Sequence, residues 1–195
     1  MENIKISGSG VIPSGTYDEV KVAGNGKIVG DITCSTLKCA GNLIAEENIS
    51  AKLVTFSGKA TIKGNMECTD IKVSGFAEFS KTVTATHMRI RGSVIVEGDL
   101  NVDVLDAKLG KSTFKNIYGD NIHIKNEGLF GLVTATDRVI LDEIEATTIN
   151  VDSIKANRVS GRDVYINGES IIDVVEYSEH LTISKYAKVN EIIKL

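Results

Sequence analysis

Histidine, cysteine and carboxylate side chains are the groups in this sequence that could support catalysis or hold a metal ion. The three histidines, His87, His123 and His180, are far apart in the sequence and fall at no common position of the repeat described below. A catalytic histidine needs a nucleophile or a carboxylate within one site, and no serine, threonine or carboxylate stands at a recognisable spacing from these three. There is also no P-loop. We therefore predict no catalytic, cofactor-binding or metal-binding residues, and a protein that is not an enzyme.

The three cysteines are better explained as small core residues than as a disulfide or a metal site. The sequence repeats about every 17 residues, as described below, and each repeat is expected to form one coil of the fold. Cys34 and Cys68 occupy the same position of this repeat, two coils apart. At that separation their Cα atoms would be about 9–10 Å apart, beyond the ~7 Å limit for a disulfide. Cys39 falls at another position of the repeat, and no Cys-x-x-Cys motif is present.

Composition excludes several broad classes of protein. The chain has 195 residues, 42% of them apolar and 5% aromatic, with a formal net charge of −4. The negative charge argues against nucleic acid as a partner. No apolar run approaches the roughly 18 residues of a membrane span. The N-terminal residues do not resemble a signal peptide, and an odd number of cysteines suits a reducing compartment. We expect a soluble cytoplasmic protein.

A repeat of about 17 residues runs through the first half of the sequence. Glycine recurs at Gly24, Gly41, Gly58, Gly75 and Gly92. Two apolar columns precede these glycines: Val20, Leu37, Val54, Ile71 and Met88, then Val22, Cys39, Phe56, Val73 and Ile90. Three more follow in register: Ile28, Ala45, Ile62, Phe79 and Val96; Ile32, Ile49, Met66, Val83 and Leu100; and Cys34, Ala51, Cys68, Ala85 and Val102. Columns in register over five repeats indicate a solenoid.

Alternation of apolar and polar residues within each repeat is the periodicity of a β-strand, not of a helix. Three short strands and three corners per repeat predict an all-β fold, a triangular β-helix with about 17 residues per coil. The corner glycines are expected to supply a backbone angle that other residues resist. About eleven coils at about 4.8 Å each would form a rod of about 50 Å. We predict one domain, residues 1–195, with regular coils at 4–104 and less regular coils at 105–195.

The repeat is not uniform. The first coil is one residue short, because the step from Ile4 to Val20 is smaller by one than the step from Val20 to Leu37. Downstream, Leu105, Ile122 and Val139 keep the regular step without corner glycines. The stretch from Asp142 to Ser160 is the least regular, and bulged or unequal coils, or a small junction, are expected there. The regular step returns where Val164 and Ile166 precede Leu181 and Ile183.

One outward-facing column is basic. Its members are Lys5, Lys21, Lys38, Thr55, Lys72 and Arg89, five cations in six positions. Such a column could dock an acidic partner or anionic lipid head groups. It could equally be a solubilising surface that discourages lateral association of sheets.

Neither end of the repeat has an obvious cap. A solenoid end exposes unpaired backbone groups and an open core, and isolated solenoids need polar caps. We predict that ends stack on ends to form a filament, with Ile4 and Ile6 at one end and Val189, Ile192 and Ile193 at the other. The alternative is that the last turn, from Ala187, folds over and seals the rod.

The repeated units resemble those of the bactofilins, the polymer-forming cytoskeletal proteins of bacteria. The residues that carry this resemblance are Ile4-Lys5-Ile6-Ser7-Gly8, Ile71-Lys72-Val73-Ser74-Gly75 and the C-terminal stretch from Val174 to Val189. The ending is similar to that of longer homologues in Gram-positive bacteria. The resemblance implies a right-handed β-helix that polymerises head to head and tail to tail, without nucleotide or other cofactor.

The resemblance also implies a scaffold role in cell shape, division, motility or envelope growth. Expected partners are further copies of the chain, a paralogous bactofilin, and envelope or motility proteins at the inner face of the membrane. Many bactofilins carry a short N-terminal membrane-targeting peptide. Here the repeat begins at Ile4, so direct binding to the membrane stays open.

Two other functions compete with a filament. Hexapeptide-repeat acyltransferases are also triangular solenoids, but they use about 18 residues per coil, a protruding loop and an active-site histidine. Acetyl-CoA binding would favour that class. A monomeric or trimeric binding module could use the basic column or a flat face for polysaccharide, although aromatic residues are scarce.

Overall fold

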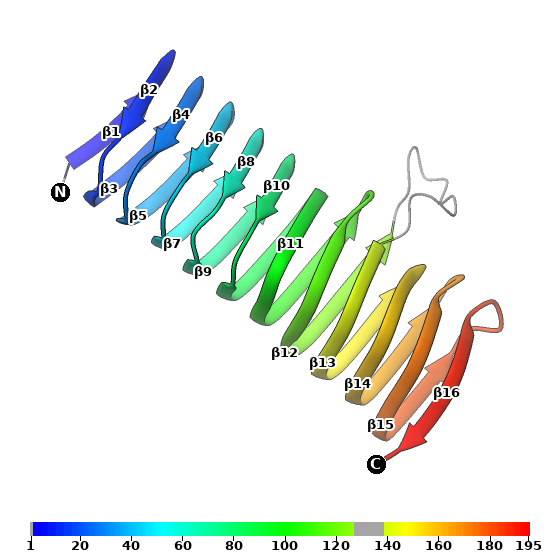
Figure 1. The fold of residues 1–195 in the computed structure, drawn as a ribbon. Coiled ribbons are helices and arrows are strands. Elements are labelled where there is room, and N and C mark those ends of the chain that lie inside the picture. Colours follow the sequence, from blue (N-terminus) through cyan, green and yellow to red (C-terminus); the bar gives the residue numbers. More distant parts are fainter. Residues whose placement is uncertain (1, 127–138) are drawn as a thin grey trace.

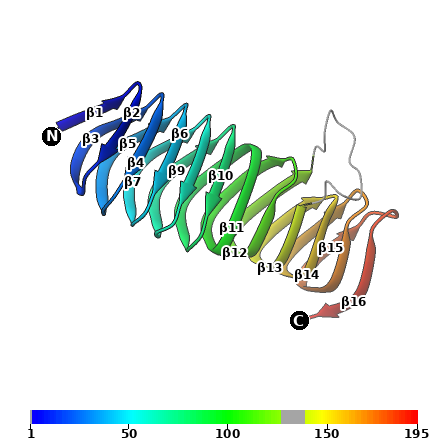
Figure 2. The ribbon, with the colours of Figure 1, turned by 45° about the horizontal axis from the view of Figure 1, so that its top comes forward.

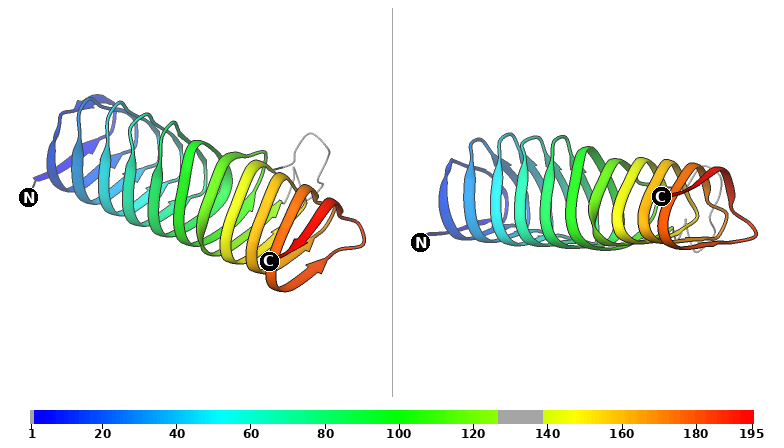
Figure 3. Two further views of the ribbon diagram at one scale, coloured as in Figure 1. Left: turned by 60° about the horizontal axis from the view of Figure 1, so that its bottom comes forward. Right: turned by 90° about the horizontal axis from the view of Figure 1, so that it is seen from below.

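The chain forms a single rod of stacked β-strands. The structure is a computed structural model that describes residues 2–126 and 139–195. Every pairing between strands is parallel, and these residues contain no helix. The coils follow one another along the rod, with the two ends of the chain at its opposite ends (Figure 1). Further views show the coils from β1 to β12 and from β13 to β16 stacked along one rod (Figures 2 and 3). The predicted all-β solenoid is confirmed.

The strands fall into two groups. Ten are short: β1 (Glu2–Ile6), β2 (Ser9–Ile12), β3 (Gly15–Val22), β4 (Asn25–Ile28), β5 (Ile32–Cys39), β6 (Asn42–Ala45), β7 (Ile49–Phe56), β8 (Lys59–Ile62), β9 (Met66–Val73) and β10 (Phe76–Phe79). Six come later in the chain, and most of them continue around corners: β11 (Val83–Leu109), β12 (Thr113–Asn126), β13 (Val139–Asp152), β14 (Ile154–Asn167), β15 (Ile171–Ile183) and β16 (Lys188–Lys194).

Each regular coil has three faces, which we call A, B and C in chain order. In the coil that starts with β5, face A is residues 32–34, face B is residues 36–39, and face C is β6. Buried and exposed residues alternate along β5 except at Ser35 and Thr36, two adjacent half-buried residues. This interruption lets the strand turn a corner while both arms keep their apolar residues inside. The predicted triangular coil follows from it.

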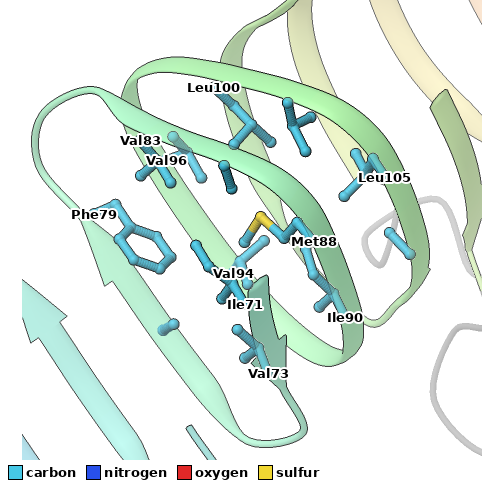
Figure 4. Packing of buried hydrophobic residues seen from close by; sticks show 14 of the residues in the cluster. Ile71, Val73, Phe79, Val83, Met88, Ile90, Val94, Val96, Leu100 and Leu105 are labelled. Atoms are coloured by element: carbon cyan, nitrogen blue, oxygen red, sulfur yellow. The ribbon is translucent and has the colours of Figure 1, made fainter. Parts of the chain in front are cut away.

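Six columns of inward side chains build the core. All members of the five columns predicted from the sequence are buried, with exposed fractions of 9% or less. A sixth column, which the sequence analysis did not recognise, lies on face C: Gly26, Leu43, Ala60, Ala77 and Val94. Figure 4 shows successive members of the columns, such as Ile71, Met88 and Leu105, pointing into one continuous interior. The core therefore runs uninterrupted through these coils.

The corner glycines are required for close approach and not for an unusual backbone angle. None of the five repeating glycines has a positive φ, so that part of the prediction is wrong. A Cβ built on Gly41, Gly58 or Gly75 would overlap the carbonyl oxygen of the corner glycine in the preceding coil. That oxygen also accepts a backbone hydrogen bond, as in Lys59 N–H to Gly41 O at 2.9 Å. Corners stacked this closely have no room for a side chain.

The spacing between coils departs from the regular step at several places. Ile4 pairs with Val20, so the first coil is short by one residue, as predicted. Ile122 pairs with Ile149 and not with Val139. The prediction that Ile122 and Val139 belong to one column is therefore wrong, because extra residues fall between β12 and β13. This stretch, residues 127–138, lies outside the described residues.

The next coil is shorter than the repeat. Val139 pairs with Ile154, a step smaller than that from Val164 to Leu181, which confirms an unequal coil within residues 142–160. Ser153 closes this coil with a left-handed φ of 58°, and Gly168 has a φ of 59° at the matching corner of the following coil. A left-handed residue reverses the chain in a small space, which accounts for the shorter corner. The predicted pairing of Val164 with Leu181 and of Ile166 with Ile183 is confirmed.

Candidate functional site

The basic column forms a straight line across adjacent strands of face B. The register pairs Lys5 with Lys21, Lys21 with Lys38, and Lys72 with Arg89, while Thr55 lies between Lys38 and Lys72. All five cations are exposed. We call this row, Lys5, Lys21, Lys38, Lys72 and Arg89, the basic ridge. Its position confirms the column deduced from the sequence, and its partner stays a prediction.

Carboxylates beside the ridge pair with some of these cations. Lys38 Nζ lies 2.8 Å from Glu19 Oε1, and Arg89 Nε lies 3.5 Å from Asp106 Oδ2. The hydrogen bond from Arg91 to Asp106, at 2.6 Å, is the largest cause of the lowered pKa of that carboxyl group. Asp106 also ends the row of cations on this face. Both pairs are largely exposed, so each stabilises the fold only weakly.

Each histidine on face B stands one coil beyond an aspartate. His87 Nδ1 is 3.5 Å from Asp70 Oδ1, and His180 Nδ1 is 2.6 Å from Asp163 Oδ1. His123 pairs in register with Asp106. His87 and His180 share one column, contrary to the prediction that no repeat position is common. Counting along the sequence in steps of 17 residues does not lead from His87 to His180. The step into β13 is longer than 17 residues, and the step from β13 to β14 is shorter.

Asp163, Glu179 and His180 form a group whose ligand atoms lie within 4.8 Å of one another. Sequence reasoning missed it, although His180 lies one regular step after Asp163, the same step that pairs Val164 with Leu181. The carboxylate of Asp163 already accepts hydrogen bonds from His180 and from Arg162, the latter at 2.8 Å, and these bonds lower its pKa. An arginine in contact with the carboxylate opposes a second cation there. The group is best described as an ion-pair cluster.

Burial suppresses the reactivity of the cysteines. It raises the pKa of the Cys34 thiol to about 11, and burial together with Asp70 and Glu67 raises the pKa of Cys68 to about 12. Burial also raises the pKa of Cys39. All three thiols are free and buried, with Ala51 between Cys34 and Cys68 in their column. Because the thiolate is both the nucleophile and the metal ligand, raised values do not favour either role.

We expect the three thiols of the folded protein to react slowly with a disulfide reagent such as Ellman's reagent. With a pKa of about 11, about one thousandth of Cys34 is thiolate at about pH 8, and burial restricts access further. Labelling should be at least about 100-fold slower than for free cysteine. Three thiols should then react at once when denaturant is added. Rapid labelling of one thiol in the folded protein would contradict this assignment.

At the N-terminal end, the two columns of face B begin at Ile4 and Ile6 of β1, whereas face C begins with β2, in which Ile12 is fully buried. The two isoleucines of β1 stack on Val20 and Val22, which are fully buried, but no coil in the described residues covers their other side. Both are therefore only half-buried. The described partners of β1 and β2 are β3 and β4, each on one edge alone. This end presents apolar side chains beside unpaired strand edges.

At the C-terminal end, β16 pairs in parallel with β15, so it extends the solenoid and does not fold across the end. Val189 stacks on Ile172, and Ile192 stacks on the fully buried Val175. Ile192 is 52% exposed, although its column is buried in earlier coils. Ile193 pairs with Glu176 and lies outside the core columns.

The fold and these surfaces define the class of protein, a parallel β-solenoid, which suits a scaffold or a binding module. No family model and no solved structure matches the chain. A stretch of 54 residues, 28% of this chain, is 37% identical to the uncharacterized protein YhbE of Bacillus subtilis (strain 168). The match spans 23% of that protein and assigns no activity. Within the described residues, no helix has the length and apolarity to cross a membrane.

Proposed function

We propose that the protein is a bactofilin-like cytoplasmic scaffold whose rods join end to end into filaments without a nucleotide. The observation that carries this proposal is the state of the two ends. Side chains that are buried in every regular coil become half-buried at Ile4 and Ile6 and 52% exposed at Ile192. Stacking another rod on either end would continue the same columns and pair the free strand edges.

The repeat itself favours assembly of this kind. Adjacent coils within the chain are joined by parallel hydrogen bonding and by stacked apolar columns. A joint between two like ends would also use strand pairing and apolar stacking, with the strands antiparallel across the joint, so it needs no separate binding pocket. Each Å² of apolar surface buried in the joint contributes about 25 cal/mol of favourable free energy. Strand pairing across the joint gives partners to the backbone groups that are unpaired at each end. The proposed role in organising envelope or motility proteins rests on the resemblance described above.

A cation placed at either end of the rod should block filament formation while leaving the rod folded. We expect Ile192→Arg to fold, because this side chain is 52% exposed, but to block stacking, because assembly would bury an unpaired charge. Gly8→Arg tests the other end. In later coils a Cβ at this corner meets the preceding coil, whereas Gly8 has open space around it. A side chain there would project from the N-terminal end.

Negative-stain electron microscopy of the purified protein, without nucleotide or metal and over a salt series, measures the outcome. The wild type should form thin filaments, and each end variant alone should form at most pairs of rods. Thr33→Arg, an exposed position on the side of the rod, is the matched control and should leave the filaments unchanged. Discrete particles from the wild type, or normal filaments from both end variants, would overturn the proposal. In the first case, acetyl-CoA and polysaccharide binding are the next measurements.

A further inference from the structure

Face B carries an excess of positive charge over the coils from Lys5 to Arg89, although the whole chain has a net charge of −4. Two outward columns run along this face. One is the basic ridge with Thr55, and the other holds Glu19, Thr36, Leu53, Asp70 and His87. Five cations against two carboxylates leave a charge of +3. The corresponding column of face A holds Thr16, Thr33, Ser50, Glu67 and Thr84, with no cation.

Three cations of the ridge have no carboxylate in contact. Lys38 pairs with Glu19 and Arg89 pairs with Asp106. Lys5, Lys21 and Lys72 form no ion pair with any residue in the described parts of the chain. Asp70, the carboxylate nearest in sequence to Lys72, faces His87 at 3.5 Å. The positive charge of the ridge is therefore available to an external anion.

Apolar side chains are also exposed on face B. Leu53 is 50% exposed and lies in the column beside Thr55, where the row of cations is interrupted. Val104 follows in the same column and is 37% exposed, and Tyr165 farther along the face is 36% exposed. The face thus combines exposed cations with apolar groups on adjacent strands of one sheet.

We propose that face B is a docking surface for an anionic lipid bilayer, on which the rod lies lengthwise. A row of cations on adjacent strands reaches one plane together, which suits a membrane surface. Adjacent strands repeat about every 4.8 Å, whereas an extended peptide repeats about every 6.7 Å on one side and a helix rises about 5.4 Å per turn. An acidic peptide would lose register with the ridge over five coils. A fluid layer of head groups has no register to match.

Flotation with lipid vesicles tests this surface, because bound protein rises with the lipid while free protein and filaments stay below. The protein should float with vesicles of phosphatidylcholine and phosphatidylglycerol, but not with phosphatidylcholine alone. Each lysine near an anionic surface changes the affinity about fivefold, so replacing Lys5, Lys21 and Lys72 with glutamine should weaken binding roughly 100-fold. Raising the salt concentration should also weaken it.

The matched control replaces three exposed lysines outside face B, Lys81, Lys111 and Lys155, with glutamine. It changes the net charge equally and should leave the affinity within about twofold of the wild type. An equal loss of vesicle affinity in both triple variants would overturn the proposal. Binding to soluble polyglutamate but not to vesicles would also overturn it, and would indicate an acidic protein as the partner. Docking does not depend on end-to-end assembly, so Ile192→Arg should still float. If the wild type forms filaments but does not float with anionic vesicles, the docking proposal is refuted and the assembly proposal stands.

Discussion

Replacing Gly58 with alanine should lower the free energy of unfolding by about 3 kcal/mol. The added Cβ would overlap the carbonyl oxygen of Gly41 and the backbone carbonyl of Ala40. These atoms cannot rotate away as a side chain would, so the corners must separate. Separation would strain the hydrogen bond from Lys59 N–H to Gly41 O, which is 2.9 Å long. The substitution therefore destabilises the fold in two ways at one corner, by steric overlap with the backbone and by weakening a hydrogen bond between adjacent coils.

Gly8→Ala is the matched control for Gly58→Ala. Gly8 occupies the same corner of the first coil, but no atom lies within 4 Å of the position its Cβ would take. Its backbone angle is not left-handed, so alanine should change stability by less than about 0.5 kcal/mol. Urea unfolding should be measured in the Ile192→Arg background and shown not to depend on protein concentration, so that neither filaments nor pairs of rods add to the apparent stability. Equal losses at Gly8 and Gly58 would mean that close stacking does not explain the glycines.

The sequence was sufficient to predict the coil, because inward residues recur at a fixed period and are buried wherever coils stack. It was insufficient for the sixth column, in which Gly26, Ala60 and Ala77 are too small to be read as core residues. In this triangular interior, small residues on one face leave room for large ones on the next. Burial there depends on the whole cross-section, which a single column does not show.

The register between coils is the second feature that limited prediction of the candidate site from the sequence. The basic ridge was predictable because Lys5 to Arg89 lie in coils with a nearly constant step. Beyond Asn126 the step into β13 includes residues 127–138, outside the described residues, and the short step into β14 includes a corner at the left-handed Ser153. These two unequal steps decide which side chains meet. The common column of His87 and His180 could therefore be found only from the structure, whereas His180 lies one regular step after Asp163, so that pairing was within reach of the sequence.

Phe56→Ala should be among the most destabilising substitutions of an apolar residue, with a loss of about 3–5 kcal/mol. Phe56 is fully buried, and its ring centroid lies 6.4 Å from that of Phe79 in the next coil. Its inward neighbours in the coil are Val54, before it on face B, and Ala60, after it on face C, while Ala51 lies on face A. Neither alanine is large enough to fill the cavity.

The preceding coil indicates how this loss can be recovered. There the same two positions are Cys39 and Leu43, a small residue followed by a large one. Phe56→Cys combined with Ala60→Leu should therefore be less destabilising than Phe56→Cys alone, by about 1 kcal/mol or more, because the volume moves to face C. Leu53→Ala, at a 50% exposed position of the same strand, should cost less than about 0.5 kcal/mol. If the double variant is no more stable than Phe56→Cys, the coils do not exchange volume between faces, and each position is fixed by contacts with its own column.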